Sequence, residues 1–252
     1  APDVINERSE YVWMVEFDPD HLQAGASTDI DNGDNFTMTN RAIKTFNFNG
    51  GVNSGALGTT EFLAGFDLFE DKDQVEVDFL IAPGMTSTTD QTTIVNDLVA
   101  TAQQTRKDCV VVASPARDDI VNLTNAATIN TNVIATANTF TNSSYLIMDG
   151  NYLKTYDKYN DQFISIPAAS STAGIMAATD LNRAAWFSPA GSRRGQYLGI
   201  TSLAYSPNKS QRDALYRADV NPIANIPGQG TILFGDKTML GRPSAFDRIN
   251  VR

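Results

Sequence analysis

The middle of the chain repeats one pattern, in which a short apolar run is followed by a longer stretch with apolar residues three or four positions apart. The apolar runs occupy residues 75–81, 109–113 and 145–148, and they recur about every 35 residues. Nearly continuous runs rich in valine and isoleucine are typical of strands buried on both faces. The pattern predicts an α/β fold, with a mostly parallel sheet, helices on both of its faces and right-handed crossovers.

Polar residues mark where the helices of this pattern should begin. Thr88 and Gln91 have the spacing of a capping box, ahead of apolar residues that share one helical face. Ser114 and Pro115 suit the N-cap and first position of the next helix. Residues 167–181, rich in alanine, indicate a helix that packs closely against a neighbour.

The two ends of the chain extend this core. Towards the C-terminus we expect strands at 197–203 and 231–234, with a helix between them that begins near Ser206 and ends before Asn221 and Pro222. Towards the N-terminus, residues 10–17 alternate like a half-buried strand, and residues 23–35 have the composition of a loop.

The domain organisation follows from the absence of a linker. We expect one domain over residues 1–252, with an N-terminal strand or hairpin region at 1–55 packing on an alternating β/α core at 56–252.

Charge narrows the classes of partner. The 252 residues include 19 basic and 29 acidic side chains, a net charge of −10, and no lysine- or arginine-rich run. Direct nucleic-acid binding is therefore disfavoured. No apolar stretch approaches the roughly 20 residues of a membrane-spanning helix, and the start of the sequence has no charged and apolar leader, so neither membrane insertion nor secretion is indicated.

Few residues are available for metal or nucleophilic chemistry. Cys109 is the single cysteine and His21 the single histidine, which excludes an internal disulfide and a histidine-rich metal site. Cys109 begins an apolar run and is expected to be an inert core residue. We expect no metal and no cofactor.

Two motifs resemble known sites and fail on physical grounds. Residues 230–238 are close to a phosphate-binding P-loop, but Asp236 puts a carboxylate where phosphate oxygens would lie, and the preceding residues read as an apolar strand. The acidic residues at 29–34 resemble the start of a calcium loop, but Asn40 stands where a glutamate is needed.

A ligand of an open α/β sheet binds beyond the carboxyl ends of the strands, which here means near Pro83, Ser114 and Asp149. Asp149, with the charged residues that follow it, could supply an acid, a base or Mg²⁺ ligands. A doubly wound enzyme or nucleotide-binding protein is therefore one hypothesis. The favoured interpretation is that Asp149 begins a tight turn.

Aromatic and charged residues alternate in two segments. Tyr152, Tyr156 and Tyr159 are interleaved with charges, and Arg193 and Arg194 follow a Trp-Phe pair. Tyrosine supplies a large amphipathic contact area at low entropic cost. We expect these five residues to contribute to contacts between protein subunits.

The chain resembles the contractile tail sheath proteins of myovirus-type bacteriophages. The resemblance extends over roughly 240 residues, in order and spacing, and its clearest matches are residues 149–152, 156–161, 186–191, 194–196, 211–216, 220–223, 230–238 and 243–252.

The resemblance implies a structural virion protein with no catalytic residue. Such subunits stack as hexameric rings around a tail tube, and the array contracts to drive the tube through the host envelope. The implied partners are other sheath subunits, the tail tube protein, and the baseplate and tail terminator proteins. The implied location is the phage tail in the virion, and the host cytoplasm during assembly.

This sequence departs from the family at both ends. Family members carry additional sequence before this region and continue after it into a helix and a C-terminal arm, whereas this chain stops at Arg252. In the family, the arms add strands to neighbouring subunits. The chain is therefore interpreted as the conserved core, without the arms, and is expected to polymerise poorly.

Overall fold

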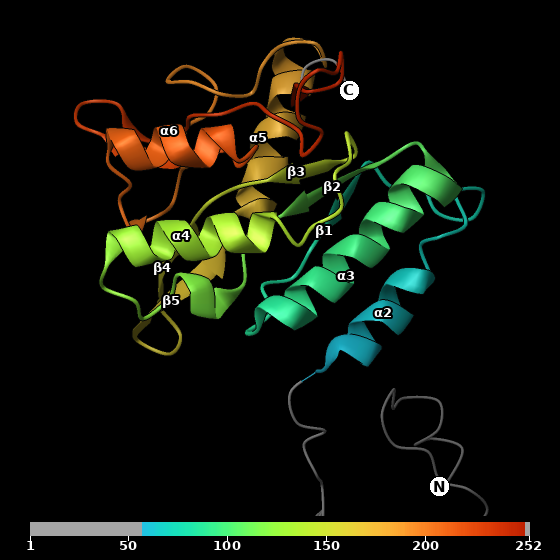
Figure 1. The fold of residues 1–252 in the computed structure, drawn as a ribbon, viewed down its shortest axis with the longest axis horizontal. Coiled ribbons are helices and arrows are strands. Elements are labelled where there is room, and N and C mark those ends of the chain that lie inside the picture. Colours follow the sequence, from blue (N-terminus) through green and yellow to red (C-terminus); the bar gives the residue numbers. More distant parts are fainter. Residues whose placement is uncertain (1–56, 250–252) are drawn as a thin grey trace, which may run out of the picture. The chain divides into compact units, whose positions relative to one another are not determined.

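The structure is a computed structural model that describes residues 57–249 (Figure 1). Contacts divide the chain into two units, Ala1–Ser54 and Gly55–Arg252, and the description below concerns the second unit alone. The predicted strand at 10–17, the loop at 23–35, His21 and the acidic residues at 29–34 lie outside the described residues.

Helices and short strands alternate through most of the described chain. The elements, in chain order, are α2 (Thr59–Asp67), β1 (Phe79–Ile81), α3 (Thr88–Ala100), the π-helical η2 (Thr101–Arg106), β2 (Val110–Ala113), the 3₁₀-helical η3 (Arg117–Asp119), α4 (Ala126–Ala137), β3 (Leu146–Met148), β4 (Tyr152–Asp157), β5 (Gln162–Pro167), α5 (Ala169–Asn182), β6 (Ser202–Leu203), α6 (Lys209–Arg217), β7 (Ile223–Ile226) and β8 (Gly230–Leu233).

The three apolar runs form one parallel sheet, as predicted. Its strand order is β1-β2-β3, with Leu80 opposite Val111 and Val112 opposite Ile147. The centre of β2 is fully buried because neighbouring strands flank it and side chains cover it above and below. Full burial of the central strand explains why its sequence is continuously apolar instead of alternating.

Successive side chains of β2 belong to different hydrophobic clusters. Val111 packs in the large cluster that includes Ile94 and Leu98 of α3 and Val133 of α4. Val112 packs with Ala173 of α5 in a separate cluster. The small side chains of α5 let this helix approach the sheet closely, which agrees with the prediction made for residues 167–181.

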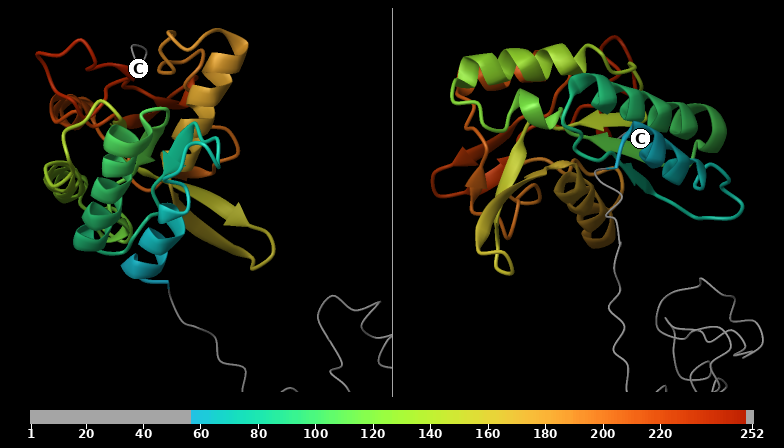
Figure 2. Two further views of the ribbon diagram at one scale, coloured as in Figure 1. Left: turned by 90° about the vertical axis from the view of Figure 1, so that its right-hand side faces the viewer. Right: turned by 90° about the horizontal axis from the view of Figure 1, so that it is seen from below.

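The prediction of a mostly parallel sheet does not extend to the rest of the chain. Strands β5-β4-β6 form an antiparallel sheet, and β7-β8 form an antiparallel pair. The described fold is therefore mixed α/β. The antiparallel pairs arise because short turns join β4 to β5 and β7 to β8, and parallel strands need longer crossovers. Figure 2 shows the β4–β5 hairpin projecting away from the parallel sheet.

The first helix of the repeat begins one residue earlier than predicted. Ser87, not Thr88, is the N-cap of α3, and its hydroxyl accepts a hydrogen bond from the backbone N–H of Asp90. Gln91 is fully buried, with Oε1 accepting from Met85 N–H at 2.8 Å and Nε2 donating to the Ser114 carbonyl at 2.9 Å. Gln91 thus links β2 to the segment after β1 and does not close a capping box.

The prediction that Ser114 caps the next helix was wrong. The helix α4 begins eleven residues later, and Asn125 caps it by accepting from the N–H groups of Ala127 and Thr128. Ser114 does bond to a helix N-terminus, but that of α5: its Oγ accepts from Ala169 N–H at 3.0 Å. Ser114 thus does accept a hydrogen bond from the first N–H of a helix, as its sequence context suggested, but the helix is α5, which is distant in the sequence and close in the fold.

Near the C-terminus the predicted strand at 197–203 is mostly irregular. Only Ser202 and Leu203 pair with β4, while Gln196 forms an isolated bridge with Ile232 of β8. The predicted helix is present as α6, capped by Asn208 with Gln211 completing a capping box. Residues after Asn221 continue into β7, a strand that the pattern did not indicate.

Two glycines give a matched test of this packing. A Cβ on Gly235 would lie 2.6 Å from Asn221 Oδ1 and 3.1 Å from its Cα, whereas a Cβ on Gly174 in α5 would meet nothing within 4 Å. We expect Gly235→Ala to lower the free energy of unfolding by about 1–3 kcal/mol through overpacking. Gly174→Ala should raise it by about 0.5–1 kcal/mol because it removes helix-destabilising backbone freedom. Urea unfolding measures both, and equal effects of the two substitutions would contradict this packing.

Candidate subunit-contact surfaces

The carboxyl end of β3 carries the residue on which the enzyme hypothesis depends. Asp149 directly follows β3 and is fully buried. Its Oδ1 accepts a hydrogen bond from Ser114 Oγ at 2.8 Å, and its Oδ2 accepts from Thr172 Oγ1 of α5 at 3.2 Å. The carboxylate therefore joins the ends of two parallel strands to the first turns of α5.

Further polar groups enclose this contact. The Thr172 hydroxyl also lies 2.9 Å from the hydroxyl of the buried Tyr197. The backbone of Asp149 bridges to Asn221, and Asn221 Nδ2 donates to the carbonyls of Met148 at 3.1 Å and Lys237 at 2.8 Å. Five chain segments thus meet at Asp149, and we call these residues the Asp149 clasp: Ser114, Asp149, Thr172, Tyr197 and Asn221.

The environment of Asp149 favours its neutral form. Burial raises the pKa of Asp149 to about 7, although hydrogen bonds from Ser114, Thr172 and the Asn151 backbone oppose the rise. Burial also raises the pKa of Tyr197 well above its usual value, so that its hydroxyl stays protonated. In the described part of the chain, no lysine or arginine forms an ion pair with Asp149.

Asp149 is fully buried and lines neither of the two surface pockets described below. The charged residues proposed to act with it lie elsewhere: Lys154 is exposed on β4, and Asp157 accepts from the turn residues Tyr159 and Asn160. Within residues 57–249, no group of three or more His, Cys, Asp or Glu side chains could hold a metal ion.

In the segment that resembles a P-loop, the charged side chains bond to other residues of the same chain. Lys237 Nζ lies 2.8 Å from Asp219 Oδ1 and donates to the Tyr216 carbonyl at 2.7 Å. Asp236 pairs with Arg248 and accepts from Ser188 Oγ at 3.0 Å. The lysine that would contact phosphate is therefore neutralised by a carboxylate of its own chain.

Of the three tyrosines predicted to lie at contacts, Tyr152 is a correction. It is 1% exposed, belongs to the main hydrophobic cluster, and donates from its hydroxyl to the Pro115 carbonyl at 3.0 Å. The tyrosine spacing suggested an exposed segment, but β4 starts inside the core, where a tyrosine can be buried with its hydroxyl paired. Tyr152 cannot reach a neighbouring subunit in this fold.

Tyr156 and Tyr159 lie on the outer part of the β4–β5 hairpin. Their side chains are 47% and 87% exposed, and Phe163 of β5 is 61% exposed. Tyr156 packs on Phe163 with ring centroids 5.3 Å apart and donates to Asp161 across the turn. Among the strands of residues 57–249, β5 lies at the edge of its sheet. The hairpin therefore presents an aromatic surface beside a strand edge that no other described strand pairs with.

Arg193 and Arg194 follow a second aromatic surface. Trp186 is 71% exposed and stacks on Phe187 with centroids 6.4 Å apart. The guanidinium of Arg194 lies 5.4 Å from the Phe187 ring, and its Nε donates to the Ser188 carbonyl at 2.8 Å. Arg193 is exposed. The loop after α5 is thus ordered by a cation–π contact and offers a free guanidinium beside it.

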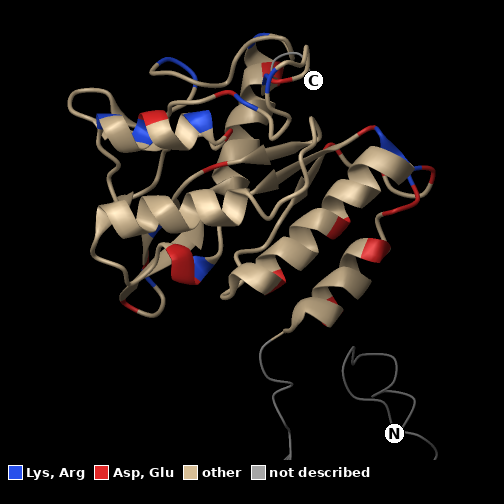
Figure 3. Ribbon diagram, in the orientation of Figure 1, with Lys and Arg blue, Asp and Glu red and all other residues tan. Residues whose placement is uncertain are grey.

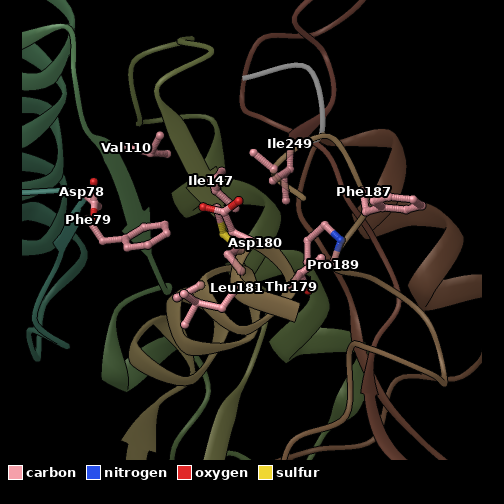
Figure 4. A pocket seen from close by; sticks show the side chains of 13 residues that line it. Asp78, Phe79, Val110, Ile147, Thr179, Asp180, Leu181, Phe187, Pro189 and Ile249 are labelled. Carbon is pink, nitrogen blue, oxygen red and sulfur yellow. The ribbon is translucent and has the colours of Figure 1, made fainter. Parts of the chain in front are cut away.

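Two pockets flank this loop. A mainly apolar groove of about 340 Å³ lies between the first residues of β1 and β2 and the C-terminal half of α5. Figure 4 shows Phe79 and Val110 on one side of this groove and Phe187, Pro189 and Ile249 on the other. A second pocket of about 350 Å³ is lined by Ala178, Thr179, Asn182, Arg183, Arg193 and Arg194. We call this second cavity the arginine pocket.

Sequence reasoning missed Arg183 and the acidic residues at 67–78. Arg183 stands at the C-terminal end of α5, eleven positions before Arg194, and only the fold brings the two together. The acidic segment was visible as an excess of carboxylates between α2 and β1, but it was assigned no role.

The described residues define a mixed α/β protein whose buried polar groups serve packing and whose surface presents aromatic and charged patches. None of the helices in this part of the chain is long and apolar enough to span a membrane. Comparison with known families is decisive: the model of the phage tail sheath protein central domain matches residues 53–239. The chain belongs to this family, as the sequence resemblance indicated.

Curated relatives agree with this assignment. The chain is 38% identical over 213 residues to the tail sheath protein of Enterobacteria phage T4, which covers 81% of this chain and 32% of the relative. It is 36% identical over 222 residues to that of Vibrio phage KVP40, covering 82% and 33%. The chain thus spans about a third of the length of these relatives.

Solved structures share the fold at low identity. The helical sheath of the anti-feeding prophage in its contracted state aligns with a TM-score of 0.55 and 20% identity, covering 76% of this chain and 46% of that one. The contracted sheath complex of an extracellular contractile injection system aligns with a TM-score of 0.54 and 20% identity, covering 71% and 44%.

The Asp149 clasp predicts a pH dependence of stability. The folded pKa, about 7, exceeds the value of 3.8 expected without burial, so the folded state binds the proton more tightly. The stabilisation is complete below about pH 4 and is lost as the pH rises through 7. We expect the free energy of unfolding to fall by on the order of 1 kcal/mol per pH unit in this window from this group.

Asp149→Asn should remove that part of the pH dependence, and the exposed Asp118→Asn should keep it. Denaturant unfolding of the three proteins between about pH 5 and pH 8 measures the difference. A wild-type slope retained in Asp149→Asn would show that Asp149 is not the group that titrates.

Proposed function

We propose that this chain is the core of a subunit of a contractile sheath, which surrounds a phage tail tube and contracts to drive the tube through the host envelope. The observation that carries the proposal is the family match over residues 53–239, together with 36–38% identity to phage tail sheath proteins. The fold shared with contracted sheaths supports the same function.

In this proposal the subunits form hexameric rings that stack into a helical array. The partners are other sheath subunits, the tail tube protein, and the baseplate and tail terminator proteins. Repetition of one heterologous contact builds a helical assembly, and contraction is a rigid-body change between two packings of the same subunits. The protein acts in the phage tail of the virion and assembles in the host cytoplasm.

We infer no catalytic role and no cofactor for this chain. Asp149, the residue on which the enzyme alternative rests, is fully buried and bonded on both oxygens to Ser114 and Thr172. A group without solvent access cannot exchange protons with a substrate. The net charge of −10 supports the absence of direct DNA binding by a protein that helps to deliver DNA. That residues 1–55 pack on the core as part of one domain stays a prediction.

We propose that subunit contacts involve four of the residues singled out in the sequence: Tyr156, Tyr159, Arg193 and Arg194. Large exposed aromatics and arginines are enriched at protein interfaces, and the unpaired edge of β5 lies beside the two tyrosines. Tyr152 is withdrawn from this set because it is buried.

The function is tested by expressing the complete product of the gene that encodes this sequence, with and without the tail tube protein of the same phage. Electron microscopy should show sheath-like tubes, with ring stacking favoured by the tube protein. A product that stays monomeric at high concentration with its tube protein present would contradict the proposal.

The contact residues are tested by the double substitution Tyr156→Ala and Tyr159→Ala. Both side chains are exposed, so we expect a change of less than about 0.5 kcal/mol in the stability of the monomer, together with loss of most tubes in electron micrographs. Tyr152→Phe is the control: it should cost about 1 kcal/mol through the lost hydrogen bond and leave assembly unchanged. Normal tubes from the double variant would exclude the hairpin from the contact.

A further inference from the structure

The arginine pocket combines three guanidinium groups with no carboxylate in its lining. Its six lining residues include Arg183, Arg193 and Arg194, and the remaining three are uncharged. Arg183 and Arg193 are exposed, and neither is paired with an acid in the described part of the chain. Like charges that face a common cavity repel one another, so the pocket gains free energy from an anionic occupant.

The chain itself carries an anionic segment on its surface. Residues 67–78 join α2 to β1, and we call them the acidic segment; its carboxylates are those of Asp67, Glu70, Asp71, Asp73, Glu76 and Asp78. All six side chains are exposed, and Lys72 is the single basic residue among them. The segment produces a local negative potential. The pKa of Asp97 is raised mainly by burial, and in addition by repulsion from the charges of Asp67 and Glu70.

A buried arginine holds the acidic segment in place. Arg106 is 2% exposed, and its guanidinium donates to the carbonyls of Phe69 at 2.6 Å and Val75 at 2.9 Å. Its Nε and Nη2 also donate to the Asp108 carboxylate, at 3.0 and 3.1 Å. Arg106 therefore fixes the backbone of the segment, while the side chains of Asp73 and Glu76 stay exposed and form no hydrogen bond with another residue of the described range 57–249.

The two charged features occupy different parts of the unit. In the ribbon of Figure 3, basic positions (blue) lie at the C-terminal end of α5 and in the loop after it, and acidic positions (red) lie at the end of α2 and in the loop that follows it. Within residues 57–249, none of the ion pairs joins the two features. Each is thus available to a second molecule, and contact between two different patches is a heterologous, repeating contact.

We propose that the acidic segment of one copy of this chain binds in the arginine pocket of the next copy. The proposal rests on the proposed sheath function, and it adds the specific pair of surfaces. Arginine binds carboxylates through two parallel hydrogen bonds, which gives the contact orientation as well as energy. Trp186 and Phe187 lie beside the pocket and would exclude water from its rim.

The first experiment compares variants that remove two charges each. Arg183→Gln with Arg193→Gln removes two pocket charges and leaves Arg194, which packs on Phe187. Asp73→Asn with Glu76→Gln removes two charges of the acidic segment. In sedimentation velocity at low salt and high protein concentration, we expect the wild-type chain to form small, weakly associated oligomers and each double variant to associate about tenfold more weakly. Salt at about 0.5 M should weaken the wild type similarly, because it screens exposed charges.

Matched controls remove the same charge at exposed positions elsewhere. Lys209→Gln with Arg217→Gln, both on α6, is the basic control, and Asp118→Asn with Asp213→Asn is the acidic control. These controls should associate like the wild type. If a control weakened self-association as much as the corresponding test variant, the change in net charge alone would explain the result, and the proposed pairing would be overturned.

Mixing the two test variants gives the sharpest result. The variant with the substituted arginines keeps its acidic segment, and the variant with the substituted carboxylates keeps its arginine pocket. One contact can therefore form between the two variants, and a third copy cannot be added. At a protein concentration near the wild-type dissociation constant, we expect dimers in the mixture and mainly monomers of each variant alone. Monomers in the mixture, or a wild-type chain that stays monomeric at low salt, would overturn the pairing. Sheath tubes from the complete gene product whose assembly is unaffected by either double variant would overturn it while leaving the sheath function intact.

Discussion

The structure depends on the Asp149 clasp. Parallel strands β2 and β3 end at the same edge, and their polar ends would be left unsatisfied under α5 without a partner. Ser114 supplies that partner twice, since it donates to Asp149 and accepts from the first N–H of α5. Asn221 then ties the C-terminal strands to the same edge. A fully bonded buried network restricts alternative packings because each member loses a hydrogen bond if it moves.

The sequence predicted the three parallel strands and the start of α6, because the residues that determine these elements lie within each element itself. The three parallel strands were found because β2 is covered on both faces, which requires an unbroken apolar run. The capping pair Asn208 and Gln211 lies within one turn of α6 and sits close to its predicted start. The predicted strand at 231–234 overlaps β8, but its antiparallel partner β7 was not predicted, because four residues with two adjacent buried positions, followed by an exposed and a partly exposed one, show no period of two.

The candidate surfaces could be predicted only in part, and the tyrosines show why. Tyr152 and Tyr156 are both in β4 and lie on the same side of the strand, yet one is 1% and the other 47% exposed. Strand periodicity gives the side but not the depth, because the hairpin leaves the core along its length (Figure 2). The arginine pocket needed the fold itself, since α5 and the following loop must turn back to bring Arg183 near Arg193.

Net charge constrains any assembly of this protein. Copies with a charge of −10 repel one another at long range. A stable array therefore needs contacts in which a positive patch of one copy meets a negative patch of the next, or contacts that bury apolar surface. The described surface has both kinds of feature: exposed aromatics on the hairpin and around Trp186, and unpaired arginines beside the latter. Long-range repulsion with short-range attraction also favours one defined register over nonspecific aggregation, because only the register that joins opposite charges overcomes the repulsion.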